Sequence, residues 1–151
     1  MNDHISLNIA DYRHSAAIQV RWGDLDALGH VNNAVYLTYV EQARIQYYRD
    51  LSLWDGSTEQ TGLIMARVTM DLKLPLYAED QVRVLTRVSR LGNRSMDTQY
   101  LIVRSKNGAD EIATAGTVTL VTFDYAANSS VAIPPEWRAK INAYEPLKPT
   151  Q

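Results

Sequence analysis

A short polar loop carries the residues of this chain that are most able to do chemistry. Two aspartates, Asp24 and Asp26, are followed by Gly29 and His30 and then by Asn33. A carboxylate held in a loop can attack a carbonyl carbon directly or act as a general base on a water molecule. Gly29 would let such a loop fold back without a side chain in the way. The sequence therefore predicts a reactive carboxylate close to the start of the element that follows.

That element is predicted to be a helix, and its first turn offers a site for an oxyanion. Residues 34–51 contain no Gly or Pro and repeat apolar residues every three or four positions, which indicates about five helical turns. Asn32 or Asn33 is the expected N-cap. The first turn of a helix presents unsatisfied backbone N–H groups and the positive end of the helix dipole. We expect Asn33 and its neighbours to donate to a carbonyl oxygen as negative charge develops on it.

The rest of the chain predicts an antiparallel sheet that encloses this helix. Alternating apolar and polar residues indicate strands at 16–22, 64–74, 82–88, 95–105 and 111–125, and a short helix is expected at 136–142. Tyrosines and apolar residues cover more than one stripe of the long helix, as expected for a helix buried on most sides. We expect one α+β domain over 1–151, with a polar N-terminal arm at 1–14 and a C-terminal helix and tail at 134–151.

Composition excludes several classes of function. The chain has 151 residues and no cysteine, which removes thiolate catalysis, cysteine-ligated zinc and iron–sulfur clusters. A formal net charge of -2 predicts no nucleic-acid partner. No stretch of apolar residues is long enough for a membrane span, and the first residues do not have the pattern of a signal peptide. We therefore expect a cytoplasmic protein.

The segment from Arg21 to Tyr36, followed by Glu41-Gln42-Ala43-Arg44, resembles the hot-dog-fold acyl-CoA thioesterases of the 4-hydroxybenzoyl-CoA thioesterase type. The shared pattern is aspartate, one residue, aspartate, two residues, glycine and then a helix capped by asparagine. The resemblance implies an α+β hot-dog fold, in which a five-stranded antiparallel sheet wraps around one long central helix. It also implies hydrolysis of an acyl-CoA or acyl-carrier-protein thioester, no cofactor, and a homodimer or homotetramer with the active site across the subunit interface.

The resemblance also assigns roles to individual residues. Asp26 falls on the catalytic carboxylate, as nucleophile or general base, and the Asn33 N–H falls on the oxyanion donor, whereas Asp24 is expected to be structural. From the residues themselves we also expect supporting roles for Gly29, His30, Tyr36 and Glu41; the chain departs from some family members at His30, Asn32 and Asn33, where others carry apolar or aromatic residues. The residues expected to contact the pantetheine or the nucleotide are Arg90, Arg94 and Ser95. The spacing of the two aspartates and His30 matches no compact metal signature, so no metal is expected.

Several alternatives stay open from the sequence. Asp26 could only stabilise its own turn, and His30 could be an acid or base or simply donate to a loop carbonyl. Glu41 could be a second acidic residue facing a partner subunit or a buried partner of Arg44. The whole protein could instead bind an acyl thioester without hydrolysing it, or act as a dehydratase or hydratase with an Asp26/His30 pair.

Overall fold

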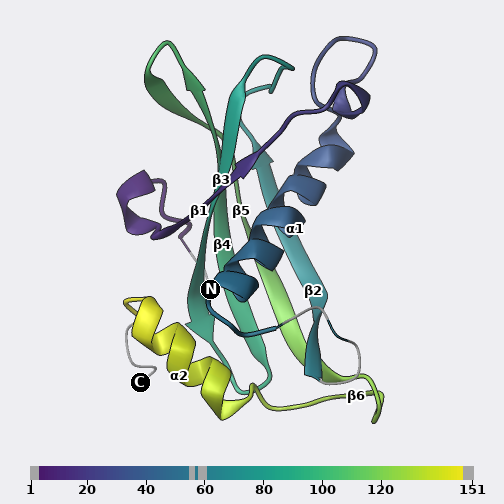
Figure 1. Cartoon of the computed structure of the whole chain (residues 1–151), viewed down its shortest axis with the longest axis vertical. Helices are drawn as coiled ribbons and strands as arrows, with labels where there is room; N and C mark the ends of the chain where they lie inside the picture. The colour runs from purple at the N-terminus through teal and green to yellow at the C-terminus, as the bar shows by residue number, and fades with distance from the viewer. Residues whose placement is uncertain (1–3, 55–56, 58–60, 148–151) are drawn as a thin grey trace.

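A long helix, α1 (Asn33–Asp50), lies against one face of a curled antiparallel sheet in this computed structural model (Figure 1). The structure describes residues 4–54, 57 and 61–147. The strands are β1 (His14–Ile18), β2 (Thr61–Leu72), β3 (Gln81–Leu91), β4 (Ser95–Lys106), β5 (Ala109–Asp124) and the short β6 (Ser129–Ser130). The remaining helical elements are α2 (Pro135–Tyr144) and two single 3-10 turns, η1 (Ile9–Asp11) and η2 (Trp22–Asp24).

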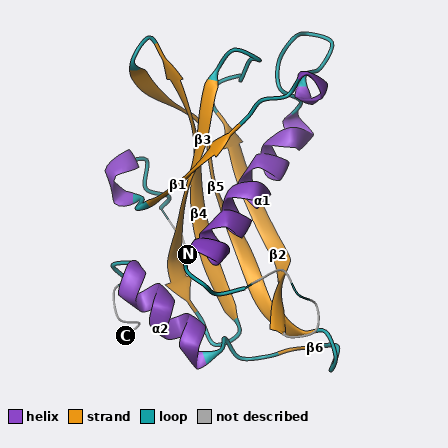
Figure 2. Cartoon of the chain, viewed as in Figure 1, coloured by secondary structure: helices purple, strands orange, loops and turns teal. Residues whose placement is uncertain are grey.

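The strands lie in the order β1-β3-β4-β5-β2, and β6 pairs with β5. Every neighbouring pair is antiparallel, so β2 runs from the end of the sheet that holds the β3–β4 turn to the opposite end. Within the described residues β2 has a partner strand on one side only. A five-stranded sheet curled around one long helix (Figure 2) confirms the predicted hot-dog fold.

The concave side of the sheet and the buried face of α1 form the main core. The buried residues of α1 are Tyr36, Tyr39, Val40, Ala43, Arg44, Tyr47 and Tyr48. They pack against inward-facing residues of β3 and β4 such as Val84, Val88, Tyr100 and Ile102. A helix buried over so wide a face agrees with the predicted enclosure, and it fixes where the two ends of α1 lie relative to the sheet.

The convex side of the sheet has its own apolar cluster beneath the N-terminal arm, residues 4–13. The cluster comprises Ile5, Ile9, Tyr12, Leu85, Leu101, Val103, Ile112 and Ala115. Gln99 of β4 fixes the arm, because its Oε1 accepts from the Ser6 N–H at 3.4 Å and its Nε2 donates to the His4 carbonyl at 3.3 Å. The sequence predicts only a polar arm and misses this packing, because the apolar residues of the arm follow no regular period. His14, expected in the arm, is the first residue of β1.

The first strand differs most from its prediction. Its expected range is 16–22, but it ends at Ile18, and Trp22 is 86% exposed. The backbone turns there because the Arg21 N–H donates to the Asp24 carboxylate at 2.9 Å, which draws residues 22–24 into η2. The other strands and helices lie within a few residues of their predicted ends. In the described part of the chain, no helix is long and apolar enough to cross a membrane.

Gly116 of β5 lies beneath the side chain of Tyr100, whose hydroxyl donates to the Thr69 carbonyl at 2.6 Å. A Cβ at position 116 would collide with both of these groups. We expect Gly116→Ala to lower the free energy of unfolding by about 1–3 kcal/mol, the usual cost of overpacking a core. Urea denaturation measures this, with Gly23→Ala as control because a Cβ there meets no atom within 4 Å. Equal unfolding midpoints for the two variants would contradict the prediction.

Candidate active site

The side chain of Asp26 holds the loop between η2 and α1 in a tight turn. Its Oδ1 accepts from the Leu28 N–H at 2.9 Å and from the His30 N–H at 3.2 Å. The Asp26 N–H donates to the His30 carbonyl at 2.7 Å. Gly29 has a φ of 81°, in the left-handed region that favours glycine. The turn occupies one carboxylate oxygen of Asp26 and leaves Oδ2 without a partner among the residues that the structure describes.

Asp24 anchors this loop to α1 from the inside. Only 3% of the residue is exposed, and its Oδ2 accepts from the Tyr39 hydroxyl at 2.7 Å. The other oxygen accepts from the Arg21 guanidinium at 3.1 Å, and the Asp24 carbonyl accepts from the Asn32 N–H at 2.8 Å. Burial alone would raise the pKa of Asp24, but the hydrogen bonds from Tyr39 and Arg21 hold this pKa below its ordinary value. Asp24 is therefore a structural carboxylate, as expected.

The start of α1 leaves one backbone donor unused. The Asn32 side chain caps the helix by accepting from the Ala34 N–H at 3.0 Å, and the Asn32 carbonyl accepts from the Val35 N–H at 2.9 Å. The Asn33 N–H is the first of the helix and cannot bond within it. In the described part of the chain no group accepts from it, so this donor is available to a ligand.

A pocket of about 220 Å³ brings the loop, the helix start and the end of β2 together. Its walls are Asp26, His30, Val31, Asn33, Tyr36, Leu72, Lys73, Leu74 and Pro75. The Tyr36 hydroxyl accepts from the Leu76 N–H at 3.1 Å, which leaves its own proton to donate. Burial raises the pKa of Tyr36, so the hydroxyl keeps that proton at neutral pH. Four residues singled out from the sequence, Asp26, His30, Asn33 and Tyr36, thus line one pocket.

His30 contributes to the loop through its backbone and not through its ring. The imidazole packs edge-on against the ring of Tyr77, with 5.1 Å between centroids. No hydrogen bond joins the His30 and Asp26 side chains among the described residues. The side-chain pair that a dehydratase or hydratase would need is therefore not formed in this structure.

Glu41 lies outside the pocket. It is exposed on α1 and makes no ion pair with Arg44 in the part of the chain described, so the interpretation as a buried partner of Arg44 is wrong. The side chain of Arg44 points inward, where its Nη1 is buried without an acceptor among those residues. A role for Glu41 toward a partner subunit stays a prediction.

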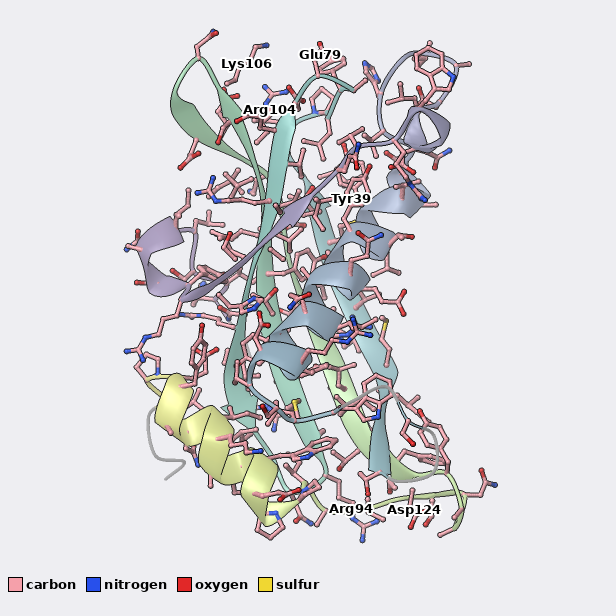
Figure 3. The ribbon with its side chains drawn as sticks, viewed as in Figure 1. Tyr39, Glu79, Arg94, Arg104, Lys106 and Asp124 are labelled. Atoms are coloured by element: carbon pink, nitrogen blue, oxygen red, sulfur yellow. The ribbon has the colours of Figure 1, made fainter. Side chains whose placement is uncertain are left out.

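Arg90, Arg94 and Ser95 do not line this pocket. Arg94 lies at the end of the sheet opposite Glu79 and Lys106 (Figure 3) and donates to Ser130 at 3.1 Å. The Arg90 Nε donates to the Asp97 carboxylate at 2.5 Å, and its Nη2 donates to the Ser95 hydroxyl at 3.4 Å. Any contact of these residues with substrate must therefore lie at a distance from Asp26 or come from another subunit.

The wall formed by residues 72–75 is not predicted by the sequence. Arg104 holds this segment, since its Nη1 donates to the Pro75 carbonyl at 2.7 Å while its Nε donates to Glu111 at 2.8 Å. The Val31 N–H completes the link by donating to the Leu76 carbonyl at 2.8 Å. Leu74-Pro75 at the end of a long alternating strand marks a turn in the sequence. Only the fold shows that this turn meets the Asp26 loop.

The residues that the structure describes contain no group of three His, Asp or Glu side chains placed to hold a metal ion. The polar groups that line the pocket are the Asp26 carboxylate, the Asn33 N–H, the Tyr36 phenol, the His30 imidazole and the Lys73 ammonium. This set suits the addition of oxygen to a carbonyl carbon, because the carboxylate can serve as base or nucleophile and the donors can bind the oxyanion.

Comparison with known proteins identifies relatives that span most of the chain. Residues 20–141 match the model of the thioesterase-like superfamily. The long-chain acyl-CoA thioesterase FadM of Escherichia coli (strain K12) is 23% identical over 134 residues, which cover 82% of this chain and 93% of FadM. The PA5185 protein from Pseudomonas aeruginosa strain PAO1 superposes with a TM-score of 0.81 at 27% identity, over 94% of this chain and 96% of that one. A thioesterase from Thermus thermophilus, complexed with coenzyme A and Zn, gives 0.77 at 32%, over 90% and 97% of the two chains.

Tyr39→Phe removes the hydroxyl that donates to Asp24. We expect this change to lower the free energy of unfolding at pH 7 by about 1.5–3 kcal/mol, the contribution of a hydrogen bond to a charged group. The pKa of Asp24 is lowered by folding, so its stabilisation is present above the unfolded value of about 3.9 and is lost as the pH falls through the folded value. The difference between variant and wild type should therefore shrink in acid.

Urea denaturation at pH 7 and pH 3 measures that difference. Tyr77→Phe is the control, because the Tyr77 ring contacts His30 but its hydroxyl forms no hydrogen bond with the described residues. A penalty for Tyr39→Phe that is the same at both pH values would show that the Asp24 charge does not contribute.

Proposed function

The chain belongs to the thioesterase-like superfamily and is a thioester hydrolase, and from this premise we propose that it hydrolyses acyl-CoA thioesters with Asp26 as catalytic carboxylate. The observation that carries the proposal is the pocket in which Asp26, the Asn33 N–H and Tyr36 meet. An acyl-CoA substrate is supported by the similarity to FadM, named as a long-chain acyl-CoA thioesterase, and to the Thermus thioesterase complexed with coenzyme A.

Asp26 can act in two ways in this geometry. As general base, its free Oδ2 takes a proton from water while the water oxygen adds to the thioester carbonyl carbon. As nucleophile, the same oxygen adds to that carbon, expels the thiolate to form a mixed anhydride, and water then releases the acid. Both routes begin with a tetrahedral oxyanion and end with the free acid and the thiol, which takes up a proton.

The oxyanion would be stabilised by donors that exist before substrate arrives. The Asn33 N–H points out of the positive end of α1 and has no other acceptor among the residues described. Tyr36 would support it, since its hydroxyl is held by the Leu76 N–H and has a proton to donate. Gly29 and His30 would keep the loop in shape through the backbone hydrogen bonds of the turn.

We further propose that the active form is a homodimer in which two copies of β2 meet. Val68 is 39% exposed and Leu72 is 49% exposed, along a strand with one open edge. Val68 and Leu72 lie two residues on either side of Met70, which packs on the main core, so they face the same side of the sheet. Leu72 also lines the Asp26 pocket. A second copy on this edge would cover the apolar strip and complete the pocket.

Asp26→Asn separates the charge of Asp26 from its role in the turn. An asparagine oxygen can still accept from the Leu28 and His30 N–H groups, so the fold should persist. We expect kcat/KM to fall at least about a hundredfold, the usual contribution of a general base. The assay is thiol release from a panel of short, long and aromatic acyl-CoAs, with Glu79→Gln as a control at the same end of the sheet (Figure 3).

Asp26→Ala should lose activity as well and also weaken the loop. Near-wild-type turnover by both Asp26 variants would remove this residue from the mechanism. No turnover of any acyl-CoA by the folded wild-type protein would instead favour a carrier-protein substrate or a protein that binds acyl thioesters without hydrolysing them.

Val68→Glu tests the dimer. Position 68 is partly exposed in a single copy, so the variant should fold, but a β2 pair would place two carboxylates in an apolar interface. Light scattering after size exclusion should give the mass of a dimer for wild type and of a monomer for the variant, with activity lost in parallel. Leu7→Glu, another exposed apolar position but on the N-terminal arm, should remain dimeric. A dimeric Val68→Glu would place the interface elsewhere.

A further inference from the structure

A single peptide group joins a buried cation to the Tyr36 hydroxyl. The Pro75 carbonyl accepts from the Arg104 Nη1 at 2.7 Å, and the Leu76 N–H donates to the Tyr36 hydroxyl at 3.1 Å. The carbonyl of Pro75 and the N–H of Leu76 belong to the same peptide bond, which is trans. Because a trans peptide is planar, these two groups point to opposite sides of it. Arg104 and Tyr36 therefore lie on opposite sides of one peptide group and are connected through it.

This connection is withdrawn from water along its whole length. Arg104 is 8% exposed, Tyr36 is 3% exposed and Leu76 is fully buried. Hydrogen bonds are electrostatically stronger in a protein interior than in water, and hydrogen bonds in a chain polarise one another. The guanidinium draws electron density toward the Pro75 oxygen, which makes the Leu76 N–H more positive. That N–H draws density from the Tyr36 oxygen in turn, so the hydroxyl proton becomes a better donor.

The proton of the Tyr36 hydroxyl has no acceptor within residues 4–54, 57 and 61–147. The oxygen accepts from the Leu76 N–H, but the proton itself is not used by these parts of the chain. Tyr36 lines the same pocket as Asp26 and Asn33. The proton is therefore available to a carbonyl oxygen that enters the pocket, and any group that polarises the hydroxyl strengthens the hydrogen bond to an oxyanion.

The register of β4 places Arg104 at the correct end and on the correct face of the sheet. Arg104 lies opposite Val82 and Ile102 lies opposite Val84, and these three apolar residues pack in the main core. Arg104 therefore shares the concave face with them, at the end of the sheet opposite Arg94 (Figure 3).

Two carboxylates hold the guanidinium in place. Glu111, opposite Arg104 in β5, accepts from the Nε at 2.8 Å. The Asp80 Oδ2 lies 3.9 Å from the Nη1 and already accepts from the Tyr77 N–H at 2.9 Å. The hydrogen bond from the Nη1 is thus left to the Pro75 carbonyl.

The charges around Tyr36 agree with this arrangement. Burial raises the pKa of Tyr36, whereas the Leu76 N–H and the Arg104 guanidinium act to lower it. The carboxylates of Asp80 and Asp26 act in the same direction as burial. The hydroxyl keeps its proton at neutral pH, so the effect of Arg104 is to strengthen a hydrogen-bond donor and not to create a phenolate.

We propose that Arg104 is a positioning residue for thioester hydrolysis, which orients and polarises the Tyr36 hydroxyl through the peptide bond between Pro75 and Leu76. This inference rests on the proposed function, because the acceptor would be the thioester carbonyl oxygen. When oxygen adds to the carbonyl carbon, the electron pair of the C=O bond moves to that oxygen, and the Tyr36 O–H donates to it. No covalent bond forms or breaks at Tyr36 or Arg104, and Arg104 does not touch the substrate.

A double-mutant cycle on Arg104 and Tyr36 tests the proposal by the rate of thiol release from an acyl-CoA. We expect Arg104→Met to lower kcat about tenfold with little change in KM, because the donor acts on the developing oxyanion. Tyr36→Phe should lower kcat about a hundredfold, the usual cost of one lost oxyanion donor. Arg104→Met should cause no further loss in the Tyr36→Phe background, because the group through which Arg104 acts is gone.

A role of Arg104 as a mere support for the pocket wall gives a different result in this cycle. Arg104→Met would then lower activity by the same factor in both backgrounds, and that outcome would overturn the proposal. Unchanged kcat for Arg104→Met in the wild-type background would overturn it as well. Arg104→Lys keeps the positive charge and should recover part of the lost kcat.

Two further variants control for folding and for the loss of an ion pair. Arg104→Met is repeated together with Glu111→Gln, which removes the carboxylate left without its partner, and Glu111→Gln alone is the reference. The matched control is Arg83→Met. Arg83 lies in the neighbouring strand and is paired with Asp110 at 2.9 Å, but it forms no contact with the peptide bond after Pro75. Its kcat should equal that of wild type.

The ionisation of Tyr36 tests the connection without turnover. With 3-fluorotyrosine at position 36, fluorine NMR follows deprotonation of this one phenol as the pH is raised. Its pKa should be higher with Arg104→Met, because loss of a nearby cation favours the neutral phenol, and unchanged with Arg83→Met. If the pKa rises as expected but the wild type cleaves no thioester, the proposed function fails and the connection stands. An unchanged pKa with Arg104→Met would overturn the inference.

Discussion

The geometry of the candidate active site depends on one buried and fully paired carboxylate. Asp24 takes hydrogen bonds from Tyr39 of α1 and from Arg21, and its carbonyl takes one from Asn32. These bonds fix the loop against the helix that it precedes, so the distance between Asp26 and the start of α1 is set. A charge removed from water is costly unless every oxygen is paired. Here the cost is offset because both carboxylate oxygens of Asp24 accept hydrogen bonds. Loss of one of these hydrogen bonds would leave a buried charge that is only partly paired.

The pocket groups that are available to a ligand are those that form no hydrogen bond with the described residues. Asp26 gives one oxygen to its turn and keeps the other, while Asn32 satisfies the N–H groups of Ala34 and Val35 but not that of Asn33. The same residue can therefore hold the loop and still offer an oxygen to a ligand. The turn and the proposed catalytic role of Asp26 are compatible, because the turn uses Oδ1 and leaves Oδ2 without a partner among the described residues.

Local chemistry explains which parts of this arrangement could be predicted. The spacing from Asp24 to Asn33 is short in sequence, so the loop, the helix start and their shared pocket follow from turn and capping preferences. The pocket wall at residues 72–75 and the packing of the arm depend on pairings between distant segments, which no local pattern encodes. Arg90 illustrates the limit: the family resemblance implies a contact with the pantetheine or the nucleotide, but only the strand register places Arg90 near Arg67 on the convex face.

Strand β2 has two faces that carry different side chains, and one of its edges has no partner strand among the described residues. Side chains alternate along a strand, so Val68 and Leu72 face the side of α1 whereas Arg67 and Lys73 face the convex side of the sheet. The register of β2 against β5 shifts between Met65 and Arg67, and this bulge decides which set points which way. A register slip of one residue beyond the bulge would turn Val68 and Leu72 toward the convex side and Arg67 and Lys73 toward the core. One irregularity in one edge strand therefore determines which side chains face α1 and which face the convex side of the sheet. Both faces meet at the end of β2, where Leu72 and Lys73 line the candidate active-site pocket.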